Sequence, residues 1–395
     1  MEDLKNKIIG VFFGGRNVEH DISIITGEFV LAELNKMGLN AVAIYIDKEG
    51  RFHINQEISK LKFFKEDFKK KLSKMKECNL SLASNKGYLE FKERGFNGKI
   101  LKVDFAFPAF HGLFGEDGSI QGLFEFLNIP YTGCGVYASS VAIDKIITKK
   151  LFKSLDIKTT NFLDLQKDNY QQDEQGIIDK IKEKLNFPLF IKPAKSGSSI
   201  GISKVDSENQ LRDALKLSFF YDGNAIIENG VENLVDLTCA TLSNGKEVIV
   251  SEVQQSVLNE DGFFDYQIKY MEDGGAQTGN AENNLIIPAS ITDDIKNQIK
   301  ELSKKIFINL KGNGTARIDF LLNSKTEEIF ANEINTLPGT LYHHLWKKSG
   351  KSISEVLEYM ILDGQKRYKE VQKISLEFNS DVLSSANSMK LNINN

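Results

Sequence analysis

Lys192 and the small residues that follow it form the first segment whose composition could serve chemistry. The segment reads Lys-Pro-Ala-Lys-Ser-Gly-Ser-Ser-Ile-Gly and ends at Gly201. Glycine and serine let backbone N–H groups approach a phosphate closely, and the leading lysine can add a positive charge. The Walker spacing GxxxxGK[ST] is absent, however, and a glycine-rich turn after a strand is by itself more often only a turn.

Two short polar patterns carry carboxylates that could bind a metal ion. Side chains alternate along a strand, so Arg317 and Asp319 share one face, and Glu333 and Asn335 share another. If the two strands form a hairpin through residues 323–327, these faces coincide and Asp319 lies near Glu333. Carboxylate and amide oxygens suit Mg²⁺ that is completed by phosphate oxygens and water. The alternative is a polar strand face on the surface of the protein.

Three further segments have the composition of site loops. His111 is followed by Gly-Leu-Phe-Gly-Glu-Asp-Gly, which adds two acids and three glycines after a strand. Residues 14–21 read Gly-Gly-Arg-Asn-Val-Glu-His-Asp and lack the GxGxxG fingerprint of dinucleotide binding. Residues 264–270, Phe-Asp-Tyr-Gln-Ile-Lys-Tyr, lie in a long glycine-rich loop and could form a lid. A merely hydrogen-bonded histidine and plain surface loops are the structural alternatives.

Strands and helices must hold these segments, and the hydrophobic pattern predicts where they lie. Residues 7–13, 40–47 and 101–110 read as buried strands, with a helix over residues 22–37 between the first two. Strand, helix and strand at this spacing predict a parallel α/β layer. We therefore expect an N-terminal α/β domain over residues 1–136.

The remainder of the chain predicts two further units. A lysine-rich helix begins at Asp144, and a strand over residues 187–192 leads into the Gly/Ser segment. Strands over residues 315–322 and 328–335 belong to the last unit. The C-terminal end is polar and is expected to be loosely attached. The expected boundaries give a central domain and a C-terminal domain, residues 137–224 and 225–395.

Composition argues against several classes of protein. The 395 residues suit two or three domains, and a hydrophobic content of 41% is enough for a real core. A net charge of -4, from 50 basic and 54 acidic residues, gives no reason to expect nucleic acid or a membrane as a partner. Cys78, Cys134 and Cys239 are too widely spaced for a disulfide framework or a zinc site. The short apolar stretch at residues 8–13 is unlike an export signal, so we expect a cytoplasmic protein.

In their order and spacing, these segments resemble the D-alanine–D-alanine ligase family over about residues 8–364. The matching segments are Phe-Gly-Gly-Arg-Asn-Val-Glu-His-Asp-Ile-Ser, His-Gly-Leu-Phe-Gly-Glu-Asp-Gly-Ser-Ile-Gln-Gly, Ile-Pro-Tyr-Thr-Gly-Cys-Gly, Asp144-Lys145, Lys-Pro with Gly-Ser-Ser-Ile-Gly, Phe-Asp-Tyr, Ala-Arg-Ile-Asp and Asn-Glu-Ile-Asn-Thr-Leu-Pro-Gly. Each segment is modest alone, but chance agreement over so many segments in one order is negligible.

The resemblance implies a three-domain ATP-grasp fold, which is α/β in the N-terminal domain and α+β in the part that binds ATP. ATP would lie between the central and C-terminal domains and would phosphorylate the carboxylate of one D-amino acid. The amine of a second amino acid would then attack the acylphosphate and expel phosphate. Because an acylphosphate is easily hydrolysed, the glycine-containing loop at residues 262–284 is expected to close over the site.

The resemblance also implies which residues bind the nucleotide and the metal ion. Seven residues would contact ATP, with the lysines on its phosphates: Lys145, Lys192, Gly197, Ser199, Glu228, Asp236 and Lys269. Asp319, Glu333 and Asn335 would bind Mg²⁺, or Mn²⁺ in its place. Hard oxygen ligands and lysines suit phosphoryl transfer, which depends on positioning and on neutralisation of charge.

The family resemblance also implies which residues bind the amino-acid substrates. Arg317 and the backbone N–H of Gly339 would stabilise negative charge on the tetrahedral intermediate. Glu19 would bind the ammonium group of the first substrate, D-alanine or another small amino acid. Hydrogen bonds would link Glu19 through Ser198 to Tyr270, with His111 close to the substrate.

The sequence departs from the family pattern at the adenosine side. The family has an Arg-Glu pair there, whose glutamate binds the ribose hydroxyls, whereas this chain has Val235 and Asp236. Asp236 is one methylene shorter than glutamate and could still accept a hydrogen bond from ribose. Reduced nucleotide affinity or an altered choice of nucleotide is therefore an open expectation.

A second departure follows Gly339. Common members continue with a Ser-x-Tyr-Pro stretch that binds the carboxylate of the second amino acid. This chain has the shorter Thr-Leu-Tyr-His-His-Leu-Trp at residues 340–346 and lacks that serine. Tyr342, His343 and His344 are candidates to replace it, and the alternative is that the histidines face solvent or pack beside the tryptophan.

The leading expectation is a ligase that joins two D-alanine molecules for cell-wall precursors with ATP and Mg²⁺. A paralogous ligase with another amino or hydroxy acid as acceptor is the alternative. A nucleotide-binding, catalytically weak regulatory protein is a third hypothesis, and the departure at residues 235–236 is its only support. Family members are commonly homodimers, and nothing in the sequence tests that state for this chain.

Overall fold

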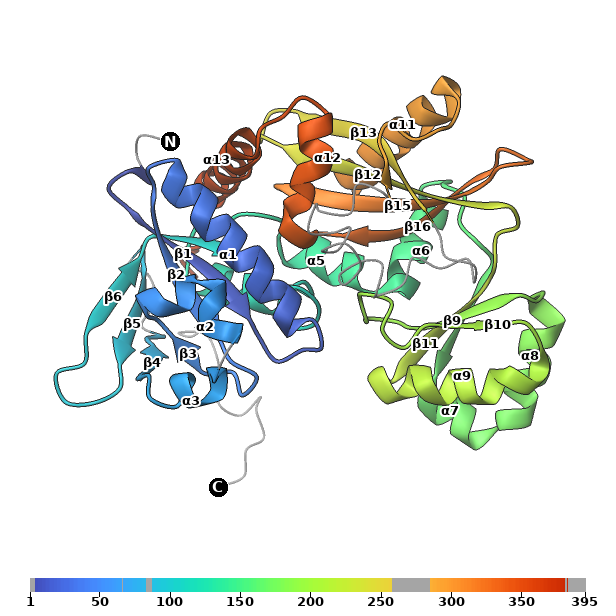
Figure 1. The fold of residues 1–395 in the computed structure, drawn as a ribbon, viewed down its shortest axis with the longest axis horizontal. Coiled ribbons are helices and arrows are strands. Elements are labelled where there is room, and N and C mark those ends of the chain that lie inside the picture. Colours follow the sequence, from blue (N-terminus) through green and yellow to red (C-terminus); the bar gives the residue numbers. More distant parts are fainter. Residues whose placement is uncertain (1–3, 66, 83–86, 258–284, 381, 383–395) are drawn as a thin grey trace.

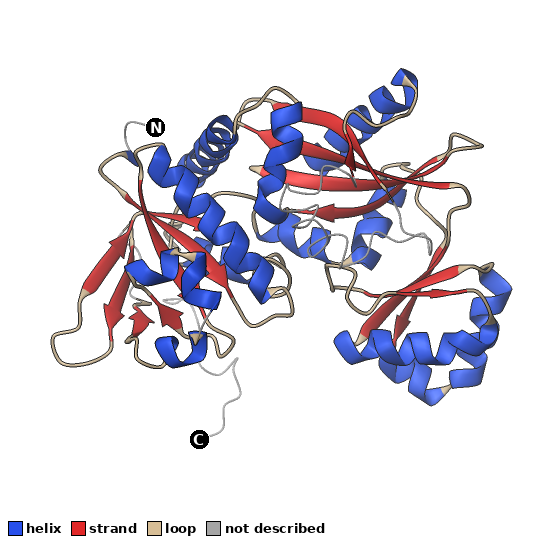
Figure 2. Ribbon diagram, in the orientation of Figure 1, coloured by secondary structure: helices blue, strands red, loops and turns tan. Residues whose placement is uncertain are grey.

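The computed structural model describes residues 4–65, 67–82, 87–257, 285–380 and 382. Within this part of the chain there are three β-sheets, each packed with helices (Figures 1 and 2). The predicted α/β class is confirmed, because the three sheets alternate with helices along the chain. The expected lid at residues 262–284, with its lysine and tyrosine, lies outside the described residues.

The first sheet has the strand order β6-β5-β4-β3-β2-β1-β7. Its elements are β1 (Ile8–Gly14), α1 (His20–Lys36), β2 (Asn40–Ile46), β3 (Phe52–His53), η2 (Gln56–Ser59), α2 (Leu61–Lys65), α3 (Phe68–Leu72), β4 (Glu77–Leu80), β5 (Leu89–Glu93), β6 (Ile100–Val103), β7 (Phe105–Pro108) and α4 (Ser119–Phe126). The predicted parallel layer is confirmed for β2, β1 and β7. The sequence did not indicate that β3 to β6 continue this sheet in antiparallel order.

The single strand predicted over residues 101–110 is wrong, because the chain forms two strands there. They pair at opposite edges of the sheet, and Asp104 separates them. Asp104 exchanges two hydrogen bonds with Ile8: its carboxylate accepts from the backbone N–H of Ile8 at 2.8 Å, and its own N–H donates to the Ile8 carbonyl at 2.9 Å. A polar residue inside an apolar run therefore marks the change of partner.

The second sheet is antiparallel, with the order β10-β9-β11-β8. Its elements are β8 (Phe162–Gln166), α7 (Lys167–Gln172), α8 (Glu174–Lys184), β9 (Leu189–Pro193), β10 (Ser203–Val205), α9 (Glu208–Tyr221) and β11 (Asn224–Asn229). Apolar residues of α8 and α9, such as Ile178 and Leu211, share a buried core with Leu189 and Ile227 of the strands. The predicted strand before the Gly/Ser segment is confirmed as β9.

The third sheet is also antiparallel, with the order β14-β13-β12-β15-β16. Its elements are α5 (Val136–Ile143), α6 (Lys145–Ser154), β12 (Leu234–Ser243), β13 (Val248–Ser256), β14 (Leu285–Ile286), α11 (Asp293–Asn309), β15 (Thr315–Asn323), β16 (Ile329–Asn335), η6 (Gly339–Tyr342), α12 (His343–Lys348) and α13 (Ile353–Val371). Leu237, Ile318 and Ile334 pack with α5, α6 and α11 in one core. Since side chains alternate along strands, Thr238, Asp319 and Glu333 lie on the other face.

The three predicted domain ranges stay a prediction, and some elements pack across them. β11 begins at Asn224, beside the expected boundary, and lies inside the second sheet. Helices α5 and α6 precede the second sheet in the chain but pack against β16 of the third (Figure 1). Helix α13 packs against both β12 and α1, so the first and third sheets share a core that includes Val11, Leu242 and Met360.

Candidate functional site

A row of polar side chains crosses the third sheet in register. Gln254 pairs with Thr238, Thr238 pairs with Asp319, and Asp319 pairs with Glu333. Directly paired residues on neighbouring strands lie close together on the same face. The hairpin expected from the sequence is therefore present, and it brings the two predicted carboxylates side by side.

Arg317 lies two residues before Asp319 and binds the same carboxylates. Its Nε lies 2.9 and 3.1 Å from the two oxygens of Asp319, and its Nη2 lies 2.6 Å from Oδ2. Nη2 also lies 3.5 Å from Glu333 Oε1, and Asn335 Nδ2 lies 3.4 Å from Asp319 Oδ2. The four predicted residues thus form one hydrogen-bonded group.

The charge of this group suits a cation. Burial raises the pKa of Asp319 to about 6, and Arg317 opposes this shift while Glu333 adds to it. Because burial is the main cause of this shift, a cation bound beside the Asp319 carboxylate would favour its charged form. In the part of the chain that the structure describes, no group of three or more His, Cys, Asp or Glu could hold a metal. The donors here are instead two carboxylates and the Asn335 amide, a set that fits Mg²⁺.

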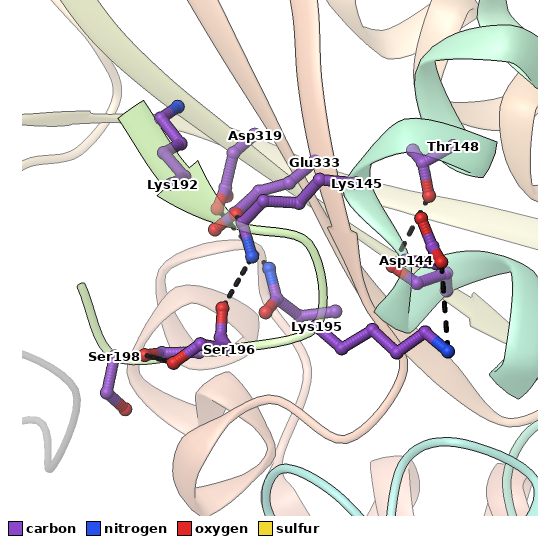
Figure 3. A network of polar contacts seen from close by, with 12 residues as sticks. Asp144, Lys145, Thr148, Lys192, Lys195, Ser196, Ser198, Asp319 and Glu333 are labelled. Carbon is purple, nitrogen blue, oxygen red and sulfur yellow. Dashed lines mark hydrogen bonds and ion pairs between the residues drawn. The ribbon is translucent and has the colours of Figure 1, made fainter. Parts of the chain in front are cut away.

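Lys145 connects this group to the Gly/Ser segment. Asp144 caps α6 by accepting from the N–H groups of Ile146 and Ile147 at 3.0 and 3.1 Å, which fixes the start of the helix. From there Lys145 donates to the Ser196 carbonyl at 2.5 Å and lies 3.8 Å from Glu333 (Figure 3). Its ammonium group therefore lies between the carboxylates and the predicted phosphate turn.

The Gly/Ser segment is a tight turn with unusual backbone angles. Ser198 and Ser199 have φ of +54° and +59°, and Gly201 has φ of +76°. Two consecutive non-glycine residues in the left-handed region are rare, and such strain concentrates at functional sites. An ordinary turn without a function would not require two serines in the left-handed region.

The first cavity lies between the second and third sheets and has a volume of about 120 Å³. Its polar wall contains Lys145, Lys192, Glu228 and Asp236, together with the turn at residues 196–199. Its apolar wall consists of Phe190, Ile202, Val231, Leu234 and Leu321. An apolar slot beside lysines and a Gly/Ser turn fits a planar base with attached phosphates. The sequence had given no sign of this apolar wall, because its residues come from four separate segments.

The departure at Val235 and Asp236 has a structural basis. Asp236 lines the first cavity, whereas Val235 packs against the core of the third sheet on the opposite face. A side chain at position 235 therefore points away from the cavity. Val235 therefore contributes to the core of the third sheet and not to the wall of the cavity.

The second cavity has a volume of about 40 Å³ and adjoins the first, next to residues that follow strands of the first sheet. Its lining includes Glu19, His111 and Glu116, which follow strands of the first sheet, and residues 334–339 at and after the end of β16 in the third sheet. Ser198 donates to Glu19 at 2.5 Å, so the expected link between these two residues is present. A Cβ on Gly197 would lie 2.6 Å from the Glu19 carboxylate, so only glycine permits this approach. The predicted partner Tyr270 and the predicted phosphate ligand Lys269 lie outside the described residues.

His111 is buried and uncharged in the second cavity. Burial and, to a lesser extent, the nearby Arg317 lower the pKa of His111 to about 3. Its Nε2 lies 2.8 Å from the Thr26 hydroxyl, which also accepts from the backbone N–H of Thr340 at 3.1 Å. A neutral imidazole can donate or accept a hydrogen bond beside a substrate carboxylate without adding a charge.

Glu116 is a site residue to which the sequence alone assigned no role. Its carboxylate accepts from the backbone N–H of Gly112 at 2.7 Å and of Leu337 at 3.1 Å. It thereby joins the loop after β7 to the turn that leads to Gly339. Burial, and then the charge of Glu19, raise the pKa of Glu116 to about 8. The signal was available, since this acid belongs to the glycine-rich segment that starts at His111.

The short segment after Pro338 is compact and buried. Thr340, Leu341 and Tyr342 all have positive φ, between 44° and 55°. Tyr342 reaches the first cavity, and its ring centre lies 5.2 Å from the Arg317 guanidinium carbon. Of the three predicted replacements for the missing serine, it is the only one that lines either cavity, among the residues described.

The two histidines of this segment have other contacts. His344 Nε2 lies 2.8 Å from Gln254 Oε1. His343 packs on Phe29 of α1, with ring centres 4.8 Å apart. Both histidines therefore contact other side chains, and neither simply faces solvent. The hydrogen bond from His344 holds Gln254, which is the first residue of the polar row on the third sheet.

The two cavities are continuous in their lining. Six residues border both of them: Lys145, Ser196, Gly197, Ser198, Arg317 and Glu333. A polyanion in the first cavity would thus have its end beside an amino acid in the second. The arrangement suits transfer of a phosphoryl group from one ligand to the other.

No helix in the described parts of the chain is long and apolar enough to cross a membrane. Two family models match the chain: the D-ala D-ala ligase N-terminus over residues 8–134 and the D-ala D-ala ligase C-terminus over residues 151–362. The D-alanine–D-alanine ligase of Thermosipho africanus is 39% identical over 362 residues, which cover 92% of this chain and 94% of that protein. D-alanine–D-alanine ligase B of Clostridium tetani is 34% identical over 366 residues, covering 91% and 93%.

Solved structures agree with these matches. The VanG D-Ala:D-Ser ligase of Enterococcus faecalis superposes with a TM-score of 0.73 at 30% identity, covering 92% of this chain and 99% of that one. The D-alanine–D-alanine ligase of Coxiella burnetii superposes with a TM-score of 0.76 at 24% identity, covering 93% and 97%. The second likeness is one of fold alone.

Proposed function

The chain belongs to the D-alanine–D-alanine ligase family, and from this premise we propose that it joins two D-alanine molecules at the expense of ATP. The intermediate of the reaction is D-alanyl phosphate, and the product serves the synthesis of peptidoglycan precursors. A cytoplasmic location and a homodimer belong to the same proposal. The homodimer rests on the family alone.

The observation that carries the proposal is the shared border of the two cavities. Arg317 and Glu333 line both, so an amino acid whose ammonium group is bound by Glu19 has its carboxylate next to the place for the last phosphate of ATP. Phosphoryl transfer depends chiefly on such positioning and on neutralisation of charge. A protein that only bound nucleotide would not need the buried carboxylate and histidine of the second cavity.

In the first step, the chain orients the donor amino acid. Glu19 binds its ammonium group, and Ser198 holds the Glu19 carboxylate in place. Lys145 and Lys192, with the N–H groups of residues 197–199, hold the phosphates of ATP so that the donor carboxylate can attack the last one. Mg²⁺ held by Asp319, Glu333 and Asn335 would neutralise phosphate charge.

In the second step, the amine of the acceptor attacks the acyl carbon, and phosphate leaves with the electron pair of the broken C–O bond. Negative charge that develops on the acyl oxygen is stabilised by Arg317 and the backbone N–H of Gly339. Glu116 holds the turn that carries Gly339 by accepting from Leu337. The acceptor must lose a proton before or during attack, and the described residues do not single out one base.

One specific feature favours a second candidate, a ligase with another acceptor. Tyr342 stands over Arg317 where common members continue toward a serine that binds the acceptor carboxylate. A site that changes its hydrogen bonds to a substrate changes specificity strongly. The similar structure of a D-Ala:D-Ser ligase supports a search among hydroxylated acceptors.

Product analysis tests the proposal. The chain would be incubated with ATP, Mg²⁺ and D-alanine, and the products would be identified by mass spectrometry. D-alanyl-D-alanine formed in proportion to released phosphate is the expected result. Turnover only after addition of D-serine or a D-hydroxy acid would favour the second candidate, and nucleotide binding without any ligation would overturn both.

A further inference from the structure

Lys149 is a buried lysine that neither cavity contains and that the proposed mechanism does not use. It lies on α6, one helical turn after Lys145, and only 1% of its surface is exposed. Burial lowers its pKa, and the nearby Glu228 opposes this shift. A buried ammonium group is costly unless it is fully paired, so its position calls for an explanation.

The three protons of Lys149 have three partners. Its Nζ lies 2.7 Å from Glu228 Oε2, 2.9 Å from the Thr159 hydroxyl and 2.8 Å from the Thr160 hydroxyl. Thr159 in turn donates to the carbonyl of Ala331 in β16 at 2.8 Å. Lys149 therefore ties the third sheet, on which α6 packs, to the second sheet, which contains Glu228.

Glu228 is held from two sides. Oε2 pairs with Lys149 and accepts from Thr160 at 2.6 Å, whereas Oε1 forms an ion pair with Lys192. Glu228 is 2% exposed. Burial alone would raise its pKa, but the two lysines lower it well below the usual range. The carboxylate is thus charged, buried and shared by two cations.

This sharing presents a conflict for Lys192. The same lysine is expected on the phosphates of ATP, yet in this structure its ammonium group is bound to Glu228. If it moves to the phosphates, Glu228 loses one of its two cations while it stays buried. Loss of the only partner of a buried charge is strongly unfavourable, whereas loss of one of two is tolerable.

We propose that Lys149 is a positioning residue that keeps Glu228 neutralised, so that Lys192 is free to bind the nucleotide phosphates. The inference rests on the proposed function, because it requires a nucleotide in the first cavity. Without Lys149, Glu228 would retain Lys192, and the phosphates would bind less tightly. Lys149 acts through these two residues and touches no substrate.

Calorimetric titration of the full chain with ADP and Mg²⁺ tests this role. Lys149→Met is expected to raise the Kd for ADP by at least about tenfold, which corresponds to ~1.4 kcal/mol. Lys150→Met is the matched control: it lies next along α6, its side chain is 53% exposed and it pairs with Asp164. The control is expected to bind ADP within about twofold of the unaltered chain.

The decisive comparison repeats Lys149→Met in a Glu228→Gln background. Without the carboxylate there is nothing to retain Lys192, so the same substitution should change the Kd less than about threefold. A tenfold loss in both backgrounds would mean that Lys149 only supports the packing of α6, and would overturn the inference. If the Lys149→Met variant did not fold, the test would rest on the double variant. A Kd for ADP within about threefold of that of Glu228→Gln would support the inference, and a tenfold higher Kd would overturn it.

The two proposals fail in different ways. An unaltered chain that does not bind ADP would refute the proposed function, and this inference with it. An unaltered chain that binds ADP, together with a Lys149→Met variant that binds it equally well, would refute this inference alone.

Discussion

Individual side chains in this protein derive their roles from the residues that surround them. Glu19 is 6% exposed, and Gly197 and Gly112 approach its carboxylate so closely that a Cβ on either would lie 2.6 Å away. The Ser198 hydroxyl donates a hydrogen bond to this carboxylate and holds it in the second cavity. The ammonium group of an amino acid is the cation that fits a small cavity with a hydrogen-bonded carboxylate.

Glu19→Gln should therefore weaken the use of the donor amino acid. We expect kcat/KM for D-alanine to fall by about 100-fold, or ~2.7 kcal/mol, because a buried ion pair with the ammonium group is lost. The KM for ATP should change by less than about threefold. Steady-state kinetics with each substrate varied in turn measures both values.

Asp21→Asn is the control for this substitution. Asp21 is exposed, lies two residues further along the chain and loses one charge in the same way. Its kcat/KM for D-alanine should stay within about twofold. If the two variants behaved alike, Glu19 would not be the ammonium ligand.

His111 should make the protein sensitive to acid. Its pKa of about 3 in the folded chain lies below the ordinary 6.5, because burial disfavours the imidazolium. The unfolded chain thus gains a proton as pH falls through 6.5, whereas the folded chain does not. The stabilisation is complete above pH 6.5 and is lost progressively toward pH 3.

Comparison with His111→Asn isolates this effect. Between pH 7 and pH 5, the unaltered chain should lose roughly 2 kcal/mol more of its free energy of unfolding than the variant, at ~1.4 kcal/mol per pH unit below 6.5. Urea unfolding at the two pH values measures the difference. Equal losses would show that His111 becomes protonated within the folded chain.

At the scale of elements, strand register does most of the positioning. The row Gln254, Thr238, Asp319 and Glu333 depends on the register of four neighbouring strands, and the register shifts directly after Asp319 in the β15–β16 pair. A shift of one residue in any strand would turn its polar side chain into the apolar core. The core residues that alternate with the row, such as Ile318 and Ile334, fix this register by their burial.

Thr238 gives a test of this support. Its hydroxyl lies 3.0 Å from Asp319 Oδ1, and Thr238→Val removes the hydrogen bond with little change of shape. The Mg²⁺ concentration for half-maximal activity should rise about tenfold, since a ligand that loses its supporting hydrogen bond binds metal less tightly. Thr241→Val, on the same strand, removes a bond to the Ala316 carbonyl and should leave the Mg²⁺ dependence unchanged. Equal Mg²⁺ requirements in both variants would contradict the role of the row.

The strands and helices were predicted well where a strong local pattern exists. β1, α1, β15 and β16 follow from apolar runs and periodicity alone. The antiparallel strands β3 to β5 were not predicted, and the pairing of β6 was not, because these strands are short and their pairing is set by neighbours in the sheet. The change of partner at Asp104 also depends on a distant residue, Ile8, and no local signal reports it.

The candidate site was partly predictable for a similar reason. Arg317, Asp319 and Glu333 stand on two adjacent strands, so alternation alone could place them together. The meeting of Glu19 with Ser198 crosses 179 residues of chain, and only the family resemblance pointed to it. Lys149 follows Lys145 by four residues on α6, and that spacing places both on one face of the helix. The sequence alone nevertheless assigned no role to Lys149.

At the scale of the whole molecule, helix α13 connects the first and third sheets. Arg367 of α13 donates to the carbonyl of Gly133 at 2.6 Å and to that of Tyr131 at 3.0 Å. Its guanidinium carbon also lies 3.9 Å from the centre of the Tyr131 ring. These contacts fix the connection that leads from the first sheet into α5, and so they help to keep the second cavity assembled.

Arg367→Ala should therefore destabilise the protein more than it impairs catalysis. We expect the free energy of unfolding to fall by ~2 kcal/mol, because charge-assisted hydrogen bonds to Gly133, Tyr131 and Asn313 are lost. KM values should stay within about twofold. Urea unfolding and kinetics measure the two effects, with Lys369→Ala, an exposed residue of the same helix, as the control. A loss of activity without a loss of stability would contradict the structural role.

If the chain activates D-alanine as an acylphosphate, one carboxylate oxygen of D-alanine becomes part of the released phosphate. D-alanine labelled with ¹⁸O in its carboxylate would be incubated with the chain, ATP and Mg²⁺, and the phosphate would be analysed by mass spectrometry. One ¹⁸O in the phosphate is expected for each dipeptide formed, because the acyl C–O bond breaks after the phosphoryl group has been transferred. Unlabelled phosphate would show that ATP is hydrolysed by water, and would contradict the joined cavities as the site of carboxylate activation.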